Sequence, residues 1–292
     1  MSSSISIGRY VPYNSLIHKL DPRLKFLSMI LLMVAVFLRV ETSNPVHNVI
    51  MNFSIYGVIV LFVLVLMLVG HIKIGSLFKQ LKAMWVMVLF LLIVNIIVPG
   101  EDTLGYFSIG SWNIQYMSLV NTGYIAVRLI IMVALSLILT STTTPLELTG
   151  ALEWYMTPFK YIKFPVHEIA MTISLALRFI PTLLDETYRI MKAQSSRGVD
   201  FENGKFKEKI RAIISLIIPL FISAFQRSDD LANAMEARGY DPRAKRTRYR
   251  VNKWHIRDSI SFLVITGLFT GLILMMVYHV DLVVIIPTWF GA

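Results

Sequence analysis

The sequence predicts an all-α membrane protein with about five transmembrane helices and a cytoplasmic or interfacial domain built from long amphipathic helices. Composition is the first observation: 55% of the 292 residues are hydrophobic and the mean hydropathy is +0.65, which is too apolar for an ordinary soluble domain. The second is that several apolar runs approach or exceed the ~20 residues that cross a bilayer. The third is a long charged stretch, 142–257, containing two segments that begin apolar and end polar.

Five apolar runs are the candidate transmembrane helices. They lie at about 24–40, 50–69, 84–98, 122–140 and 260–280. The N-terminal sequence MSSSISIG has no charged side chain and leads into no cleavable apolar core. We therefore predict no signal peptide and expect the first span to remain as an anchor.

These runs divide the chain into three predicted domains. Residues 1–141 form a membrane domain with the first four spans, and residues 142–257 form a domain with two long helices that end at Arg197 and Arg238. Residues 258–292 hold the last span and a short outer tail.

Positive charge is concentrated on one side of this arrangement. The formal net charge is +10, and 26 of the 28 Lys and Arg residues fall in the N-terminal segment, after the second span, or within 142–257. The loop 100–120 and the tail 281–292 hold none. Because Lys and Arg are enriched in cytoplasmic loops, the pattern predicts a plasma-membrane protein with a cytoplasmic N-terminus and an extracellular C-terminus. It also explains the charge without a nucleic-acid partner.

Two further apolar runs, at about 169–184 and 210–225, lie inside the cytoplasmic domain. As an extra transmembrane pair they would place the basic residues between them outside the cell. Each run contains a proline and continues into a polar half, which favours helices that lie along the membrane surface or dip into it. Both interpretations stay open, and we favour the interfacial one.

The spans carry little chemistry. None has Asp or Glu in its middle, and the absence of Cys excludes disulfides and zinc–thiolate sites. Arg128 is interpreted as a charge near the outward end of the fourth span that snorkels outward. Gly267 and Gly271 have the spacing of a close helix-packing pair. His167–Glu168 lacks the second His of a zinc-protease motif, so we expect no catalytic residue, metal site or cofactor in this chain.

An internal repeat is the most informative feature. Residues 174–200, SLALRFIPTLLDETYRIMKAQSSRGVD, match residues 215–241, SLIIPLFISAFQRSDDLANAMEARGYD, at a constant offset of 41. Apolar residues at helical spacing predict two helices of about 30 residues, roughly 45 Å each. Their expected apolar stripes are Ile173, Leu177, Ile180, Leu184 and Met191, and Ile210, Ile213, Ile217, Leu220, Ala224, Leu231 and Met235.

Each predicted helix ends at a small residue, an arginine and a glycine. Gly suits the left-handed position just beyond a helix, and Arg is favourable near the carbonyl end, so helix capping alone explains one such end. Two copies in register suggest more: a small neighbour leaves each guanidinium free to enter a groove on another protein. The predicted docking residues are Ser196, Arg197, Gly198, Ala237, Arg238 and Gly239.

These motifs resemble those of the transmembrane T component of energy-coupling factor transporters, the family that includes the cobalt-uptake permease Q subunit. The similarity also extends to the surrounding AMEARGYDPRAKRT and to the N-terminal SLIHKLDPRLKF at 15–26. It covers nearly the whole chain in the same order. Ser196 is the one departure, since Ala is commoner there.

The resemblance implies a non-catalytic scaffold subunit of an importer. Two cytoplasmic ATP-binding-cassette subunits would receive Arg197 and Arg238, and a separate membrane-embedded S component would capture a vitamin or transition metal. ATP would be bound by the partner ATPases, and this chain has no G-x-x-x-x-G-K-[ST] motif.

The basic run within 243–257 has two interpretations. One is contact with anionic lipid before the last span, which we favour. The other is a second contact with an acidic partner. Its members are Arg243, Lys245, Arg246, Arg248, Arg250, Lys253 and Arg257.

Other functions remain as alternatives. A stand-alone secondary carrier is expected to place ionisable groups at membrane depth, and an intramembrane enzyme needs paired catalytic groups there. A passive membrane anchor of a complex needs neither.

Overall fold

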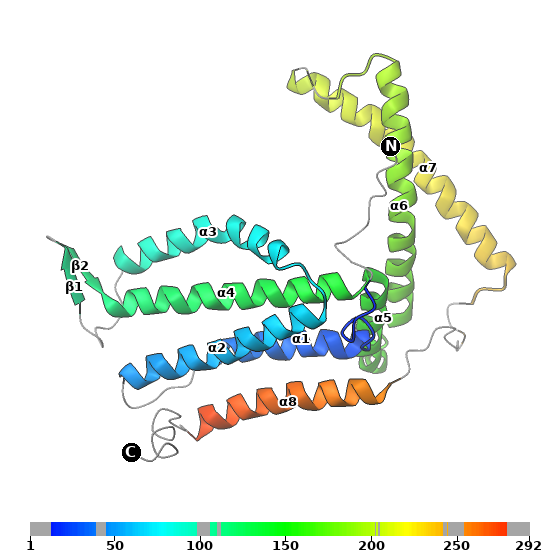
Figure 1. The fold of residues 1–292 in the computed structure, drawn as a ribbon. Coiled ribbons are helices and arrows are strands. Elements are labelled where there is room, and N and C mark those ends of the chain that lie inside the picture. Colours follow the sequence, from blue (N-terminus) through cyan, green and yellow to red (C-terminus); the bar gives the residue numbers. More distant parts are fainter. Residues whose placement is uncertain are drawn as a thin grey trace. The chain divides into compact units, whose positions relative to one another are not determined.

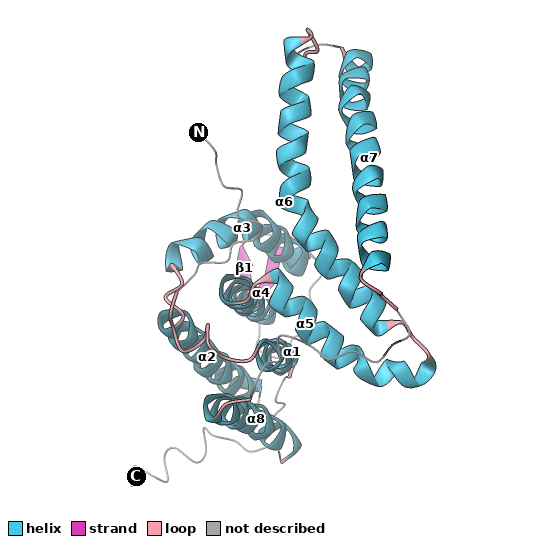
Figure 2. Cartoon of the chain, turned by 90° about the vertical axis from the view of Figure 1, so that its right-hand side faces the viewer, coloured by secondary structure: helices cyan, strands magenta, loops and turns pink. Residues whose placement is uncertain are grey.

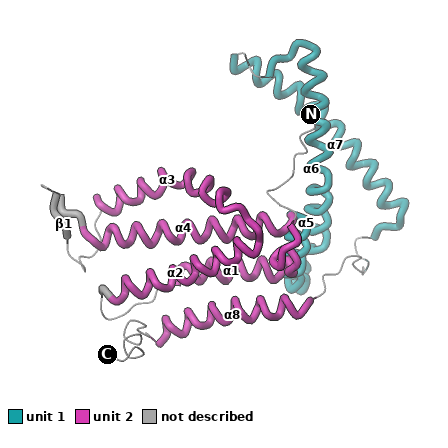
Figure 3. The backbone as a smooth tube through the Cα atoms, viewed as in Figure 1, with its two compact units in different colours: residues 1–7, 145–251 teal, residues 8–144, 252–292 magenta. Residues whose placement is uncertain are grey.

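The computed structural model describes residues 13–38, 45–97, 106–109, 112–201, 203, 205–241, 244 and 254–278. Within these residues the chain is almost entirely helical, which confirms the predicted fold class (Figures 1 and 2). A short antiparallel hairpin that was not predicted precedes the fourth long helix, and it pairs Tyr106 with Gln115. The chain divides into two compact units (Figure 3): unit 1 holds residues 1–7 and 145–251, and unit 2 holds residues 8–144 and 252–292.

Unit 2 holds the most apolar helices and the hairpin. Its elements are α1 (Pro22–Phe37), α2 (Pro45–Val69), α3 (Ile74–Ile97), β1 (Tyr106–Ile109), β2 (Trp112–Gln115), α4 (Tyr116–Thr142) and α8 (Ile256–Val277). Unit 1 is built from α5 (Pro145–Met156), the 3-10 helix η1 (Thr157–Ile162), α6 (Val166–Ser196) and α7 (Phe206–Ala237).

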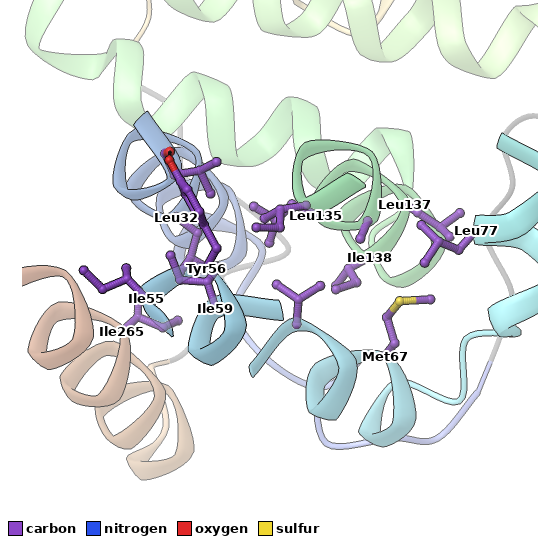
Figure 4. Packing of buried hydrophobic residues seen from close by; sticks show 14 of the residues in the cluster. Leu32, Ile55, Tyr56, Ile59, Met67, Leu77, Leu135, Leu137, Ile138 and Ile265 are labelled. Carbon is purple, nitrogen blue, oxygen red and sulfur yellow. Dashed lines mark hydrogen bonds between the residues drawn. The ribbon is translucent and has the colours of Figure 1, made fainter. Parts of the chain in front are cut away.

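The core of unit 2 lies between α1, α2 and α4. Leu32 of α1, Ile59 of α2 and Leu135 of α4 lie in one buried cluster (Figure 4). Val36 of α1 and Ile131 of α4 belong to the same cluster, and all five residues are almost completely buried. α3 contributes only Leu77 to this buried cluster, and α8 only Ile265. The outer helices therefore present most of their apolar surface outward, as expected of helices that contact lipid or a membrane partner.

Five helices of the described chain are long and apolar enough to cross a membrane: α2, α3, α4, α6 and α8. This makes the chain a multi-pass membrane protein and confirms the expected number, but the set differs from the prediction. α1 has 16 residues, about 24 Å, and is shorter than the ~30 Å hydrocarbon core. α6, which we had favoured as an interfacial helix, meets the criterion of length and composition because its first half is apolar.

The third and fourth long helices begin earlier than their apolar runs predicted. α3 starts at Ile74 and α4 at Tyr116, not at residues 84 and 122. Hydropathy alone ends a span at its polar residues, whereas Lys79, Gln80 and Lys82 of α3 are good helix formers and let that helix continue. Asn95 of α3 donates a hydrogen bond to the Thr122 hydroxyl of α4 (3.0 Å), a polar link between two apolar helices.

Arg128 lies in the middle of α4, so its predicted position near the outward end was wrong. It is twelve residues, about 18 Å, from the start of the helix. Its Nε donates a hydrogen bond to the Tyr56 hydroxyl (2.8 Å), and its guanidinium carbon lies 5.8 Å and 5.7 Å from the ring centres of Phe37 and Tyr56. The side chain is therefore held against α1 and α2 and does not snorkel outward.

This arrangement satisfies the end of α1. The Tyr56 hydroxyl donates to the carbonyl of Val36 (3.4 Å), one of the last four carbonyls of α1, which have no partner within the helix. A cation beside this end is also favoured by the helix dipole. α1 can thus end at the level of Arg128 because side chains of neighbouring helices meet its polar groups.

The close packing predicted for Gly267 and Gly271 is absent from the described chain. No atom lies within 4 Å of a Cβ placed on either glycine.

We expect Tyr56→Phe to lower the thermal stability of the detergent-solubilised protein. The change leaves Arg128 Nε and the Val36 carbonyl without their shared partner, a loss of about 1–3 kcal/mol. A thermal-shift measurement by size-exclusion chromatography reads the change in melting temperature. Tyr116→Phe removes an exposed hydroxyl on α4 and is the matched control; equal melting temperatures for the two variants would contradict the proposed role of Tyr56.

Candidate functional site

The two helices predicted from the repeat form an antiparallel pair. α6 has 31 residues and α7 has 32, and both continue through their internal prolines, Pro181 and Pro219. Figure 2 shows them side by side, and Figure 1 shows that they cross at an angle. The prediction of two long helices is confirmed.

Two hydrogen bonds fix the register of the pair. Gln194 Nε2 of α6 donates to the carbonyl of Ser215 (3.4 Å), and Arg227 Nη1 of α7 donates to the Thr182 hydroxyl (3.1 Å). The two contacts are twelve residues apart on both helices, as antiparallel pairing requires. Arg227 also lies over the Phe179 ring, 6.0 Å from its centre.

This register gives the pair an approximate two-fold symmetry. Moving two residues inward from Thr182 and Arg227 pairs Leu184 with Phe225, and these residues are also equivalent in the 41-residue repeat. Arg197 and Arg238 each lie thirteen residues beyond that centre, or about 20 Å along their helices. The repeat and the register together place the two arginines at opposite ends of the pair.

The two helix ends have the same hydrogen-bond pattern. At the first, Gly198 N–H donates to the Ser195 carbonyl (3.0 Å) and Val199 N–H to the Gln194 carbonyl (3.1 Å). The second repeats this with Gly239 to Glu236 (2.9 Å) and Tyr240 to Met235 (3.0 Å). These are Schellman motifs, which require a left-handed residue just beyond the cap. Gly198 has φ +87° and Gly239 φ +69°, so the predicted capping role of both glycines is confirmed.

The cap position of each motif is the arginine itself. Arg197 has φ −90° and ψ 7°, and Arg238 has φ −88° and ψ 7°, so the two backbones project their side chains in the same way. Both residues are exposed, as are the neighbouring Ser196 and Ala237. Neither guanidinium forms a salt bridge with any residue that the structure describes.

The small residue before each arginine adds no bulk beside it. The Ser196 hydroxyl donates to the Lys192 carbonyl (3.1 Å) of its own helix. It therefore does not extend over the space beside the Arg197 guanidinium, as a longer side chain would. Ser196 thus occupies the position in the same compact manner as Ala237.

Comparison with known proteins agrees with this arrangement. A model of the cobalt transport protein family CbiQ matches residues 13–249. The chain belongs to this family. Its relatives include the energy-coupling factor transporter transmembrane protein EcfT of Bacillus subtilis (strain 168), which is 40% identical over 271 residues, covering 92% of this chain and 98% of that protein. The family predicted from the two Arg–Gly ends is confirmed.

Other relatives carry the same name and cover the same extent. The EcfT protein of Streptococcus thermophilus (strain ATCC BAA-250 / LMG 18311) is 42% identical over 268 residues, covering 92% of this chain and 96% of that protein. The EcfT protein of Macrococcus caseolyticus (strain JCSC5402) is 41% identical over 264 residues, covering 90% and 95%. This chain is thus similar to these EcfT proteins along nearly their whole length.

The two ends differ in what lies beside them. The end of α7 is tied back to the start of α6, because the Tyr240 hydroxyl donates to Met171 Sδ (3.4 Å). Beside the end of α6 there is instead an open hollow. Its lining residues are Tyr188, Met191, Lys192, Ser195, Gly198, Val199, Asp200 and Phe201.

The first half of α7 exposes apolar side chains of its predicted apolar stripe. Ile213 and Ile217 are 51% and 53% exposed, whereas Ala212 on another side of the helix is buried. The exposed large apolar residues of α7 are Phe206, Ile210, Ile213, Ile214, Ile217, Ile218, Phe221, Ile222 and Phe225.

The predicted basic run lies mostly outside the described residues. Arg243, Lys245, Arg246, Arg248, Arg250 and Lys253 of the basic run lie outside the described residues, and Arg257 is exposed in the first turn of α8. Among the described residues, no group of three or more His, Cys, Asp or Glu side chains is placed to hold a metal ion.

Replacing either capping glycine by alanine should loosen the helix end that presents the arginine. An L-residue in the left-handed region costs about 1–2 kcal/mol, so we expect the amides of Val199 in Gly198→Ala and Tyr240 in Gly239→Ala to exchange with deuterium several-fold faster. Gly150→Ala is the control, because its Cβ meets no atom within 4 Å and its φ is not positive. Unchanged exchange at both ends would show that the Schellman geometry does not depend on glycine.

Proposed function

We propose that this chain is the energy-coupling scaffold of an energy-coupling factor importer. It links ATP hydrolysis by two cytoplasmic ATPase subunits to uptake of a vitamin or transition metal through a separate S component. The observation that carries the proposal is the pair of matched, exposed arginines at opposite ends of one helical pair. One isolated Arg–Gly end is explained by capping, whereas two with the same backbone geometry suit two similar partners.

Arginine is well suited to this docking role. Its guanidinium is always charged and forms paired hydrogen bonds with carboxylates or carbonyls in a fixed fork. Within the described chain Arg197 and Arg238 have no acidic partner, so their donors remain available. If such an arginine is bound in a groove of the partner, its removal costs about 2–5 kcal/mol of binding free energy, because the partner's buried groups are left unpaired.

The distance between the two arginines supports binding to two separate subunits. Each lies about 20 Å from the two-fold centre of the pair at Leu184 and Phe225, so the two arginines are up to ~40 Å apart along the helices. In this proposal one ATPase receives the Ser196–Arg197–Gly198 end and the other receives the Ala237–Arg238–Gly239 end. Movement of the ATPases would then turn or shift the α6–α7 pair.

The membrane-facing parts fit the remaining partners. Exposed apolar side chains on α3 and α7 suit lipid and the S component, since large apolar patches mark interaction surfaces. The basic segment 243–257 is proposed to face anionic lipid of the cytoplasmic leaflet. The charge distribution supports a cytoplasmic N-terminus and an extracellular C-terminus in the plasma membrane.

Arg128 bears on the alternative of a stand-alone carrier. A cation at membrane depth is the kind of group that such a carrier uses. Here its Nε is engaged by the Tyr56 hydroxyl, and through it by the end of α1. This favours a structural role for Arg128 and a coupling subunit without its own transport site.

We expect Arg238→Ala to weaken co-purification with the ATPases, and the double variant Arg197→Ala/Arg238→Ala to abolish ATP-driven uptake. The physical reason is that the polar groups lining the groove of each ATPase lose their hydrogen-bond partner. Arg→Lys at both sites keeps the charge but not the fork, so it should restore only part of the binding.

Arg189→Ala is the matched control, because Arg189 is an exposed arginine of α6 outside the motif. It should leave assembly and uptake unchanged. Undiminished co-purification and uptake in the double variant would overturn the proposal, and substrate-independent ATPase activity of the assembled complex would favour a passive anchor.

A further inference from the structure

The N-terminal motif at residues 15–26 contains buried charges that docking to ATPases does not explain. Asp21 and Lys25 are 6% and 8% exposed, and Asp258 of α8 is 1% exposed. All three belong to unit 2 and lie in one cluster. Charged side chains are rarely buried unless their polar groups are met, so the contacts of this cluster indicate its purpose.

Asp258 joins the start of α8 to the start of α1. Its Oδ1 accepts a hydrogen bond from the Asp21 N–H (2.9 Å), although the two residues are 237 positions apart. Its Oδ2 accepts from the His255 N–H (2.8 Å), which caps α8. The Asp21 side chain in turn accepts from the Arg23 N–H (2.9 Å) and caps α1. The N-terminal caps of two helices therefore form one connected network.

Lys25 joins the same segment to the end of α4. Its Nζ donates to the carbonyl of Thr142 (2.9 Å), the last residue of α4, and to the carbonyl of His18 (3.1 Å). The cation thus satisfies a carbonyl at the negative end of the α4 dipole. A contact between Ser15 Oγ and His18 Nδ1 (2.7 Å) fixes the turn that presents the His18 carbonyl.

Two of the attachment points lie near places where the chain passes between the units. The chain leaves unit 2 after Thr144, two residues beyond Thr142, and returns to unit 2 at Asn252, shortly before His255 and Asp258. The end of α4, which leads to the segment that carries α6 and α7, and the start of α8, which follows that segment, are therefore both bonded within unit 2 to the same N-terminal motif.

We propose that residues 15–26 act as a clamp that transmits movement of α6 and α7 to the membrane helices. A helix end is the weakest part of a helix, because its last four carbonyls have no partner within the helix. A load applied beyond Thr142 or before His255 would unravel α4 or α8 locally. Lys25 and Asp258 prevent this by holding those ends to α1. Asp21, Lys25 and Asp258 are positioning residues, and the transmission part of the proposal rests on the proposed function.

The test compares Lys25→Met, which keeps the aliphatic stem and removes the donor, with Lys25→Arg, which keeps a charged donor. Asp258→Asn replaces one of the two carboxylate acceptors by an amide donor, so the side chain can no longer accept from both the Asp21 N–H and the His255 N–H. The controls are Lys19→Met, an exposed lysine in the same segment, and Asp230→Asn, an exposed aspartate of α7.

The first measurement is hydrogen–deuterium exchange of the full chain in lipid nanodiscs. We expect the amides in the last turn of α4 to exchange at least tenfold faster in Lys25→Met, and the Asp21 amide to do so in Asp258→Asn. The controls should match the wild type, and Lys25→Arg should lie between. Wild-type exchange rates in both clamp variants would overturn the proposal. If Lys25→Met does not fold, Lys25→Arg and Asp258→Asn supply the same comparison.

The second measurement is the amount of substrate taken up per ATP hydrolysed by the complete complex with its ATPases and S component. We expect Lys25→Met and Asp258→Asn to keep ATPase binding and hydrolysis but to lower uptake per ATP several-fold. A purely structural role predicts that hydrolysis and uptake fall together, and that result, or an unchanged ratio, would overturn the transmission role.

The two measurements separate this inference from the proposed function. If the wild-type chain assembles with no ATPase, the proposed function fails and the transmission role fails with it. The exchange data still decide whether the N-terminal motif holds the ends of α4 and α8.

Discussion

The unpaired polar groups at helix ends are the constraint on which this molecule's architecture depends. In an apolar surround each unpaired carbonyl or N–H is costly, so every buried end requires a partner from another part of the chain. Lys25 serves the end of α4, Asp258 serves the starts of α1 and α8, and Tyr56 with Arg128 serves the end of α1. These few polar contacts decide which helices are neighbours, while the apolar core around Ile59 and Ile131 fills the space between them.

Unit 1 uses helix ends differently. There the ends of α6 and α7 complete themselves through glycine in a Schellman motif, so they need no partner side chain and remain exposed. The arginine at each cap position is consequently presented to solvent. A helix end that is capped by its own backbone has a fixed conformation and leaves the arginine side chain exposed. This suits a surface that must bind another protein without rearranging.

The helices differ in how much of their apolar surface is buried. α1 and α4 bury much of their length, whereas α3 and the first half of α7 expose large side chains such as Trp85, Phe90 and Phe221. A chain that exposes so much apolar area needs lipid or a membrane partner around it. The polar contact between Asn95 and Thr122 gives α3 a fixed partner despite its small share of the core.

The sequence by itself determined the helical class, the two long helices and their glycine ends, because hydropathy, periodicity and the left-handed preference of glycine are local properties. It predicted five membrane-length helices, but it included α1, which is too short, and left out α6. It placed Arg128 and the starts of α3 and α4 wrongly, since hydropathy does not see where a helix continues through polar residues. Only the tertiary structure joined Asp21 to Asp258 and Lys25 to Thr142 and set the antiparallel register of α6 and α7, since these contacts between distant residues follow from packing in three dimensions.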